Sequence, residues 1–130
     1  MRQVSLILML LSCLFMFGCS RSNVPKEKYF SGEPVDHWLE QIKSPDPKKR
    51  KKAADILGNV GPADERSIPA LIEAVKDKDS KVRDAAVLGL SKIGPLANSA
   101  ATVLEEATKD KDSTVRTHAS KALEQVRGAK

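Results

Sequence analysis

Few residues of this chain carry side chains that could do catalytic or metal chemistry. The sequence holds two histidines, His37 and His118, and two cysteines, Cys13 and Cys19. Neither histidine has a second His or Cys at the short spacing that metal ligands usually show. A glycine-rich phosphate loop and a Ser/His/Asp arrangement are also missing from the sequence. We therefore expect no enzyme activity, no cofactor and no metal.

One cluster of charge points to a ligand, the run of five cations Lys48-Lys49-Arg50-Lys51-Lys52. Such a run could meet anionic headgroups or an acidic protein. On a helix the five side chains point in every direction, so a plain solvated helix is the alternative. The net charge of +5 is too mild to imply nucleic-acid binding by itself. The candidate partner-binding residues are Lys48, Lys51, Lys52, Lys81, Asp84 and Lys121.

The basic run belongs to a segment that recurs along the chain. The segment 79–86 returns as residues 112–119, a shift of 112 − 79 = 33, and a looser copy occupies residues 46–53. Residues 68–94 and 101–127 agree at 12 of 27 positions, where chance gives roughly two. Three copies at one period predict a repeat array.

Each copy is predicted to form a helical hairpin, because apolar residues recur at helical spacing on both sides of a short turn. In the middle copy Ser67 is expected to cap the first helix and Asp79 the second. Gly94-Pro95, and Gly61-Pro62 one repeat earlier, should end the second helices, with glycine in the left-handed conformation. The helices expected in the first and third copies are 34–41, 46–59, 99–108 and 112–127.

The period of 33 also fits ankyrin and tetratricopeptide arrays, but their residue patterns are missing from the sequence. The pattern Asp-x-x-Val-Arg-x-x-Ala-x-x-x-Leu-x-x-Ile-Gly over residues 79–94 resembles HEAT repeats, specifically the short bacterial form also seen in phycobilisome lyases. The resemblance covers roughly residues 32–127. It implies an all-α fold, an α-solenoid of about three hairpins, with repeats at about 33–66, 67–99 and 100–130 in a domain of residues 33–130.

The resemblance also implies roles for the repeated aspartates and arginines. In HEAT arrays the first helices form the convex face and the second helices the concave face, and an Asp and an Arg form a ladder between neighbouring repeats. Carried over, Asp46, Asp79 and Asp112 would face Arg50, Arg83 and Arg116. The alternative is that each Asp only caps its helix and each Arg is a solvated i,i+4 partner. Both interpretations are structural rather than catalytic.

Polar residues at the two ends of the array indicate where stacking stops. Lys49 stands at the position of Val82 and Val115, while Glu105 and Thr108 replace apolar residues of the earlier copies. Terminal repeats need such polar outer faces, so we expect a complete array of three repeats. Within it, the side chain of Leu90 should be buried between hairpins.

Residues 1–18 are predicted to be an export signal, with a short basic start and an apolar run too short to span a bilayer. Cys19 resembles a lipobox cysteine, which is acylated and becomes the new N-terminus, although Met16 stands where leucine is usual. Cys13 follows a better box but leaves a very short apolar region. An ordinary cleaved signal and an uncleaved membrane anchor are the alternatives. Residues 19–32 would be the linker.

Tyr29 and Phe30, at the end of that linker, are expected to fold onto the first repeat as a lid rather than to form a ligand-binding aromatic pair.

Three function classes follow for the whole chain. The first is a lipid-anchored scaffold of the cell envelope that binds a protein through the concave face. Ser20 after the cysteine favours the outer membrane in a two-membrane cell. The other two are an enzyme or accessory of the bilin-lyase type and a binder of anionic surfaces.

Overall fold

The structure, a computed structural model, describes residues 29–128. The predicted signal, Cys19 and most of the predicted linker lie outside these residues. The elements in chain order are β1 (Tyr29–Phe30), β2 (Glu33–Pro34), α2 (Val35–Gln41), α3 (Pro47–Val60), α4 (Ser67–Ala74), α5 (Ser80–Ile93), the 3-10 helix η1 (Gly94–Ala100), α6 (Ala101–Ala107) and α7 (Ser113–Val126).

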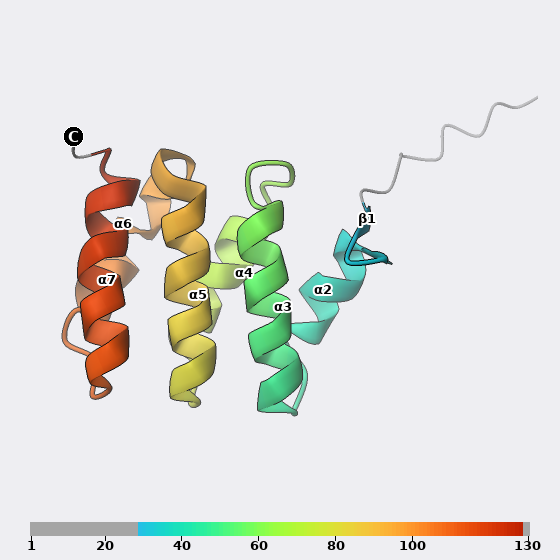
Figure 1. The fold of residues 1–130 in the computed structure, drawn as a ribbon, viewed down its shortest axis with the longest axis horizontal. Helices are drawn as coiled ribbons and strands as arrows, with labels where there is room; N and C mark the ends of the chain where they lie inside the picture. The colour runs from blue at the N-terminus through green and yellow to red at the C-terminus, as the bar shows by residue number, and fades with distance from the viewer. Residues whose placement is uncertain (1–28, 129–130) are drawn as a thin grey trace, which may run out of the picture.

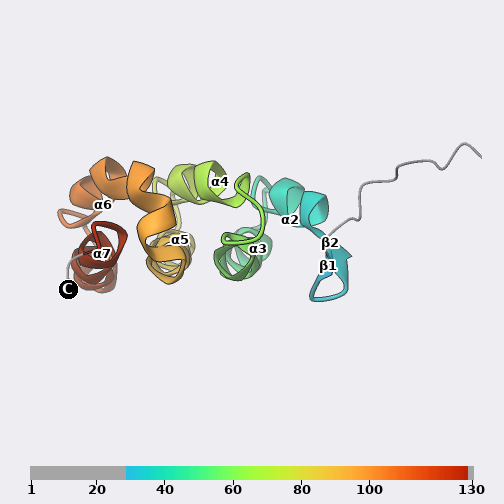
Figure 2. The ribbon, with the colours of Figure 1, turned by 90° about the horizontal axis from the view of Figure 1, so that it is seen from above.

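The helices pair into three hairpins, α2/α3, α4/α5 and α6/α7, which stack side by side. Figure 1 shows the long second helices α3, α5 and α7 as parallel neighbours. Seen from above, the short first helices α2, α4 and α6 form a second layer (Figure 2). The predicted all-α solenoid of a few hairpins is therefore confirmed.

The second helices begin where the sequence predicts, at an aspartate. The carboxylate of Asp46 accepts a hydrogen bond from the N–H two residues on, at 2.9 Å. Asp79 and Asp112 each accept from the N–H groups two and three residues on, at 2.9 and 3.3 Å and at 2.8 and 3.3 Å. Each Asp thus satisfies donors that the first helical turn leaves unpaired.

The first helices begin differently from the prediction. Ser67 does not cap α4, since Arg66 is the N-cap residue and Ser67 lies in the first turn with its hydroxyl buried. Asp64 takes part of the capping role, because its Oδ1 accepts from the Arg66 N–H at 3.1 Å. In the third repeat α6 starts at Ala101 rather than Ser99, since η1 occupies the preceding residues.

The two Gly-Pro sequences have different conformations. Gly94 ends α5 with φ +65° and ψ −137°. The positive φ is as predicted and suits glycine, which has no Cβ atom to clash, but the ψ angle lies outside the left-handed helical region. Gly61 ends α3 in the right-handed helical region, so the predicted left-handed conformation is wrong there. Glycine is required at position 61 for a steric reason instead. A Cβ atom at Gly61 would lie 2.2 Å from Cδ1 of Ile93 in the next repeat.

The core runs through all three hairpins and is built from aliphatic side chains. Leu90 is fully buried, as predicted. Val82 and Val115 are fully buried as well, whereas Lys49, at the equivalent position of the first repeat, is exposed. The largest completely buried side chains in the described residues include Leu57, Leu71, Leu90 and Leu104.

The segment before the first hairpin is a two-residue antiparallel ladder, in which Tyr29 pairs with Pro34 and Phe30 with Glu33. The Phe30 carbonyl accepts a hydrogen bond from the Trp38 indole N–H at 2.9 Å, and the Phe30 ring packs against the core. Tyr29 is 64% exposed. The predicted lid is therefore formed by Phe30 and not by Tyr29.

Helices α3 and α5 approach closely at a pair of glycines. A Cβ atom at Gly58 would lie 2.5 Å from the Gly89 Cα atom, a distance that backbone atoms do not tolerate. A Cβ atom at Gly89 would lie 3.2 Å from the Gly58 Cα atom and 3.2 Å from Leu71 Cδ2. The steric conflict at Gly89 is less severe than that at Gly58, because its contacts are longer and one of them is with the side chain of Leu71.

We expect Gly58→Ala to destabilise the array by about 1–3 kcal/mol, because the methyl group forces α3 and α5 apart. In a helix without this contact the same change would stabilise by about 1 kcal/mol. Gly89→Ala, the matched control, should cost less. The free energy of unfolding from denaturant titration, followed by circular dichroism, measures both. A Gly58→Ala variant as stable as the parent would contradict the close approach.

Candidate functional site

The first two repeats are joined by the guanidinium group of Arg50. Its Nε and Nη2 donate to the two carboxylate oxygens of Asp77 in the next repeat, at 2.7 and 2.9 Å. Its Nη1 donates to the carbonyl oxygens of Ser44 and Pro45, at 2.9 Å each. Arg50 is only 6% exposed, so this bidentate pair lies largely out of water. One side chain thus closes its own interhelical turn and fixes the next repeat.

Arg83 repeats this arrangement one period later. Its Nε and Nη2 donate to Asp110 at 2.7 and 2.9 Å, and its Nη1 donates to the carbonyls of Asp77 and Lys78 at 2.8 and 3.2 Å. Arg116, at the third position, keeps only the bonds from Nη1 to its own turn, at 2.8 and 3.1 Å. It is exposed at the C-terminal edge of the described array.

The predicted partners of this ladder were wrong. Arg50 and Arg83 hydrogen-bond to other carboxylates, while Asp79 and Asp112 accept N–H groups of their own helices through Oδ1. The acceptors are Asp77 and Asp110, two residues before each cap. The alternative prediction of solvated arginines is also wrong for Arg50 and Arg83, which are buried. The capping role of the aspartates holds in all three repeats.

The ladder shifts the ionisation of its carboxylates. Burial raises the pKa of Asp77, but hydrogen bonds from Arg50 and from the Asp79 N–H outweigh it and hold the pKa below its ordinary value. For Asp110 the hydrogen bond from Arg83 is the largest cause of a lowered pKa. A carboxylate with a lowered folded pKa stabilises the protein fully above its unfolded value, near pH 4. That contribution is lost as the pH falls through the folded value.

The exposed sides of α3, α5 and α7 form a continuous surface, which we call the second-helix face. Because the repeats are in register, positions 33 apart lie side by side on it. Leu88, 37% exposed, lies near its middle and is equivalent to Asp55 on α3 and Lys121 on α7. The predicted partner-binding residues Lys48, Lys51, Lys81, Asp84 and Lys121 all belong to this face.

Hydrogen bonds connect neighbouring helices across the second-helix face. His118 Nδ1 lies 2.6 Å from Asp84 Oδ1, and Ser91 Oγ donates to Gln125 Oε1 at 2.7 Å. Both contacts join α5 to α7. Within α3, Lys51 forms an ion pair with Asp55 at 2.7 Å. The sequence had shown neither the histidine contact nor the Ser91 contact, because their residues lie 34 positions apart.

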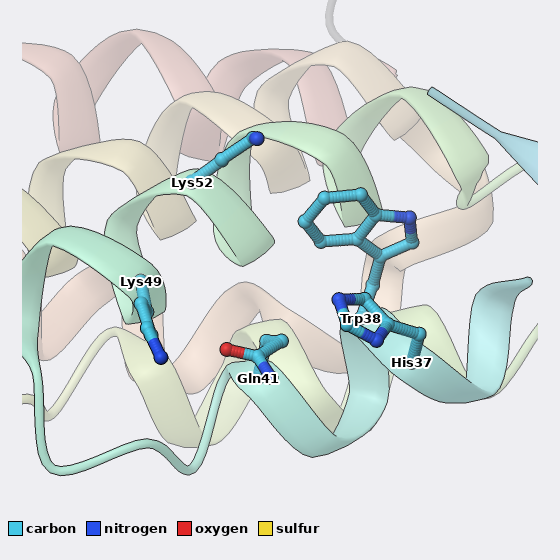
Figure 3. A pocket seen from close by; sticks show the side chains of 5 residues that line it. All are labelled: His37, Trp38, Gln41, Lys49 and Lys52. Carbon is cyan, nitrogen blue, oxygen red and sulfur yellow. The ribbon is translucent and has the colours of Figure 1, made fainter. Parts of the chain in front are cut away.

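Lys52, also predicted to bind a partner, lies elsewhere. It borders a hollow of about 270 Å³ at the N-terminal edge, together with His37, Trp38, Gln41 and Lys49 (Figure 3). Its Nζ is 5.4 Å from the centre of the Trp38 ring. Sequence reasoning missed His37, Trp38 and Gln41 as neighbours of the lysines. The signal was present in the alignment, since the equivalent residues in the next repeat are Ala70, Leu71, Ala74, Val82 and Ala85.

Comparison with known proteins decides the family. A family model described as HEAT repeats matches residues 35–124, about two thirds of the chain. The chain belongs to the HEAT-repeat family. Among solved structures, the crystal structure of an engineered protein is 26% identical with a TM-score of 0.58. The alignment covers 72% of this chain and 45% of that protein, so this chain spans less than half of its length. A comparison with curated proteins finds no match.

HEAT repeats typically bind other proteins. Within residues 29–128 no three His, Cys, Asp or Glu side chains gather in a group that could hold a metal ion. In the same residues every helix is too short or too polar to cross a membrane.

Arg83→Gln should destabilise this HEAT-repeat array by about 2–4 kcal/mol at neutral pH, because it leaves the half-buried Asp110 carboxylate without its partner. Arg116→Gln, the matched control, should cost less than about 1 kcal/mol, since it loses only the bonds to its own turn. Chemical denaturation measures both values. Equal losses of unfolding free energy in the two variants would mean that the Arg83–Asp110 pair contributes no stability of its own.

The same variants should differ in acid. Below about pH 4 the parent protein should lose stability as Asp77 and Asp110 take up protons. Arg83→Gln should show a shallower loss, because Asp110 no longer gains from ionisation in the folded state. Arg116→Gln should keep the slope of the parent. Denaturant midpoints measured between pH 2 and pH 6 test this, over a range set by the ordinary aspartate pKa.

Proposed function

We propose that this HEAT-repeat chain is a protein-binding scaffold that is exported, anchored by a lipid at Cys19, and engaged by its partner through the second-helix face. The observation that carries the choice of face is Leu88, a large apolar side chain exposed on the central helix α5. Around it the face offers cations and carboxylates, including Lys81, Asp84 and Lys121. An apolar centre with a charged rim is the usual anatomy of a protein interface.

The rigidity of the face supports the same proposal. Helix α5 is held to α3 by the close approach of Gly58 and Gly89 and to α7 by the contacts of Asp84 and Ser91. A surface that is already ordered loses little conformational entropy when a partner docks. The stack therefore presents side chains from three helices at fixed spacings.

Export and anchoring rest on the sequence before the described residues. The basic start, the apolar run up to Gly18 and the cysteine at position 19 together favour acylation. With Ser20 as the next residue, the outer membrane is the favoured location in a two-membrane cell. Binding is favoured over bilin-lyase activity, because the sequence after Cys19 holds no further cysteine that could act as a thiolate nucleophile.

A photocrosslinking residue placed at position 88 should capture a discrete partner from membranes of the source cell. The matched control is position 96, since Leu96 is also exposed, at 67%, but lies in η1 outside the second helices. Lys121→Glu should reduce the adduct at position 88 about tenfold or more, as expected when one central contact is lost. Equal crosslinking at positions 88 and 96 would exclude the second-helix face as the binding surface.

Cys19→Ala should abolish incorporation of labelled fatty acid and either release the protein from the membrane fraction or block its processing. Cys13→Ala leaves the favoured cysteine in place, so this variant should still incorporate labelled fatty acid and remain in the membrane fraction. Fractionation and fatty-acid labelling in the producing cell measure the outcome. Labelling that survives in Cys19→Ala and disappears in Cys13→Ala would move the anchor to Cys13.

A further inference from the structure

The hollow at the N-terminal edge, lined by His37, Trp38, Gln41, Lys49 and Lys52, occupies the place where a preceding repeat would stack. The register of the repeats shows this. Ala70 and Ala74, equivalent to His37 and Gln41, lie beside Ile42 of the first repeat. In the next pair, Val103 and Ala107 lie beside Val75. In the first repeat this apolar stacking surface has become polar and open.

The residues that stand in place of Ala70, Ala74, Val82 and Ala85 of the next repeat are His37, Gln41, Lys49 and Lys52, and none of the residues lining the hollow is acidic. Lys49 and Lys52 lie one turn apart on α3, while His37 and Gln41 lie one turn apart on α2, so donors from two helices border one space. Figure 3 shows these side chains around the opening. A surface that is required only to be solvated can carry both positive and negative side chains, whereas the charged side chains lining this hollow are all positive.

The two lysines are not neutralised by the rest of the described protein. Neither Lys49 nor Lys52 forms an ion pair with a residue between 29 and 128. Lys51, between them in sequence, is paired with Asp55 at 2.7 Å. Lys49 also lies in the first turn of α3, where the helix dipole adds positive potential. The hollow is therefore a place of uncompensated positive charge.

The wall of the hollow is fixed in position. Trp38 is only 4% exposed, and its indole N–H is held by the Phe30 carbonyl at 2.9 Å. The His37 ring packs edge-on against the indole, with ring centres 5.0 Å apart. The aromatic wall formed by Trp38 and His37 is thus ordered before any ligand arrives, which lowers the entropic cost of binding.

We propose that this hollow binds the phosphate group of a phosphate ester. Lysine ammonium groups act as point charges with several donors, which suits the tetrahedral oxygens of phosphate. The Gln41 amide and the His37 ring add further polar groups, and Trp38 offers an apolar wall to the organic part of the ester. A volume of about 270 Å³ admits a phosphate with a small substituent. The proposal is independent of the second-helix face.

Trp38 is the only tryptophan in the 130-residue chain, so its fluorescence reports on this hollow directly. The full chain is titrated with glycerol phosphate, with vesicles of equimolar phosphatidylglycerol and phosphatidylcholine, and with pure phosphatidylcholine vesicles. Lys49→Gln/Lys52→Gln should weaken binding about tenfold or more, because two charge-assisted contacts are lost. Since Lys52 lies over the reporting ring, calorimetry is run in parallel. Lys78→Gln/Lys111→Gln removes the same charge from exposed turn residues and should change binding less than about twofold.

Gln41→Glu supplies a second variant, which places a carboxylate among the lysines and should abolish binding while Lys49 and Lys52 remain. A saturable response to glycerol phosphate supports a soluble ester as ligand. A response to phosphatidylglycerol vesicles alone, beyond that to pure phosphatidylcholine, supports a lipid headgroup. No response to either, or equal weakening in the two lysine double variants, overturns the site.

Discussion

The stack depends on two buried guanidinium groups, each of which connects its own helix to the preceding turn and to the next repeat. Arg50 and Arg83 hold the carbonyls of their own turn and, through a bidentate contact, the aspartate of the next repeat. Burying such a cation is unfavourable unless every donor finds an acceptor, so the contact tolerates little change in the spacing of two repeats. Hydrophobic burial supplies most of the stability, and the ladder sets the register in which it occurs.

The two edges of the array show what happens when one half of this contact is missing. At the N-terminal edge Ser44 stands in the position of Asp77 and Asp110, so the first repeat offers no acceptor to a preceding arginine. At the C-terminal edge Arg116 keeps its turn but has no carboxylate partner among the described residues. There Arg127 pairs with Glu105, which stands where the earlier repeats have Leu39 and Ile72. At each edge of the described array one half of the inter-repeat contact is therefore missing.

The repeat architecture separates structure from function along each second helix. One side of α5 carries Arg83, Ala86 and Leu90, which are buried and recur as arginine, alanine and leucine in all three repeats. The opposite side carries Asp84 and Leu88, whose equivalents differ in every repeat. The fold therefore constrains the first set, and the second set is free to specify a partner. The N-terminal hollow follows the same logic, since only the first repeat lacks a preceding neighbour in the described structure.

The sequence by itself determined the period, the hairpins, the aspartate caps and the burial of Leu90, because these depend on helical spacing and on contacts within a few residues. It also identified Arg50 and Arg83 as structural, but it assigned them the wrong aspartates. Asp77 and Asp79 lie two residues apart in one turn, and only the packing of neighbouring repeats decides which one points across the seam. The hollow around Trp38 and the role of Gly61 were likewise decided by tertiary structure. Gly61 meets Ile93 of the next repeat only when the hairpins stack, and the hollow forms only when α2 packs against α3.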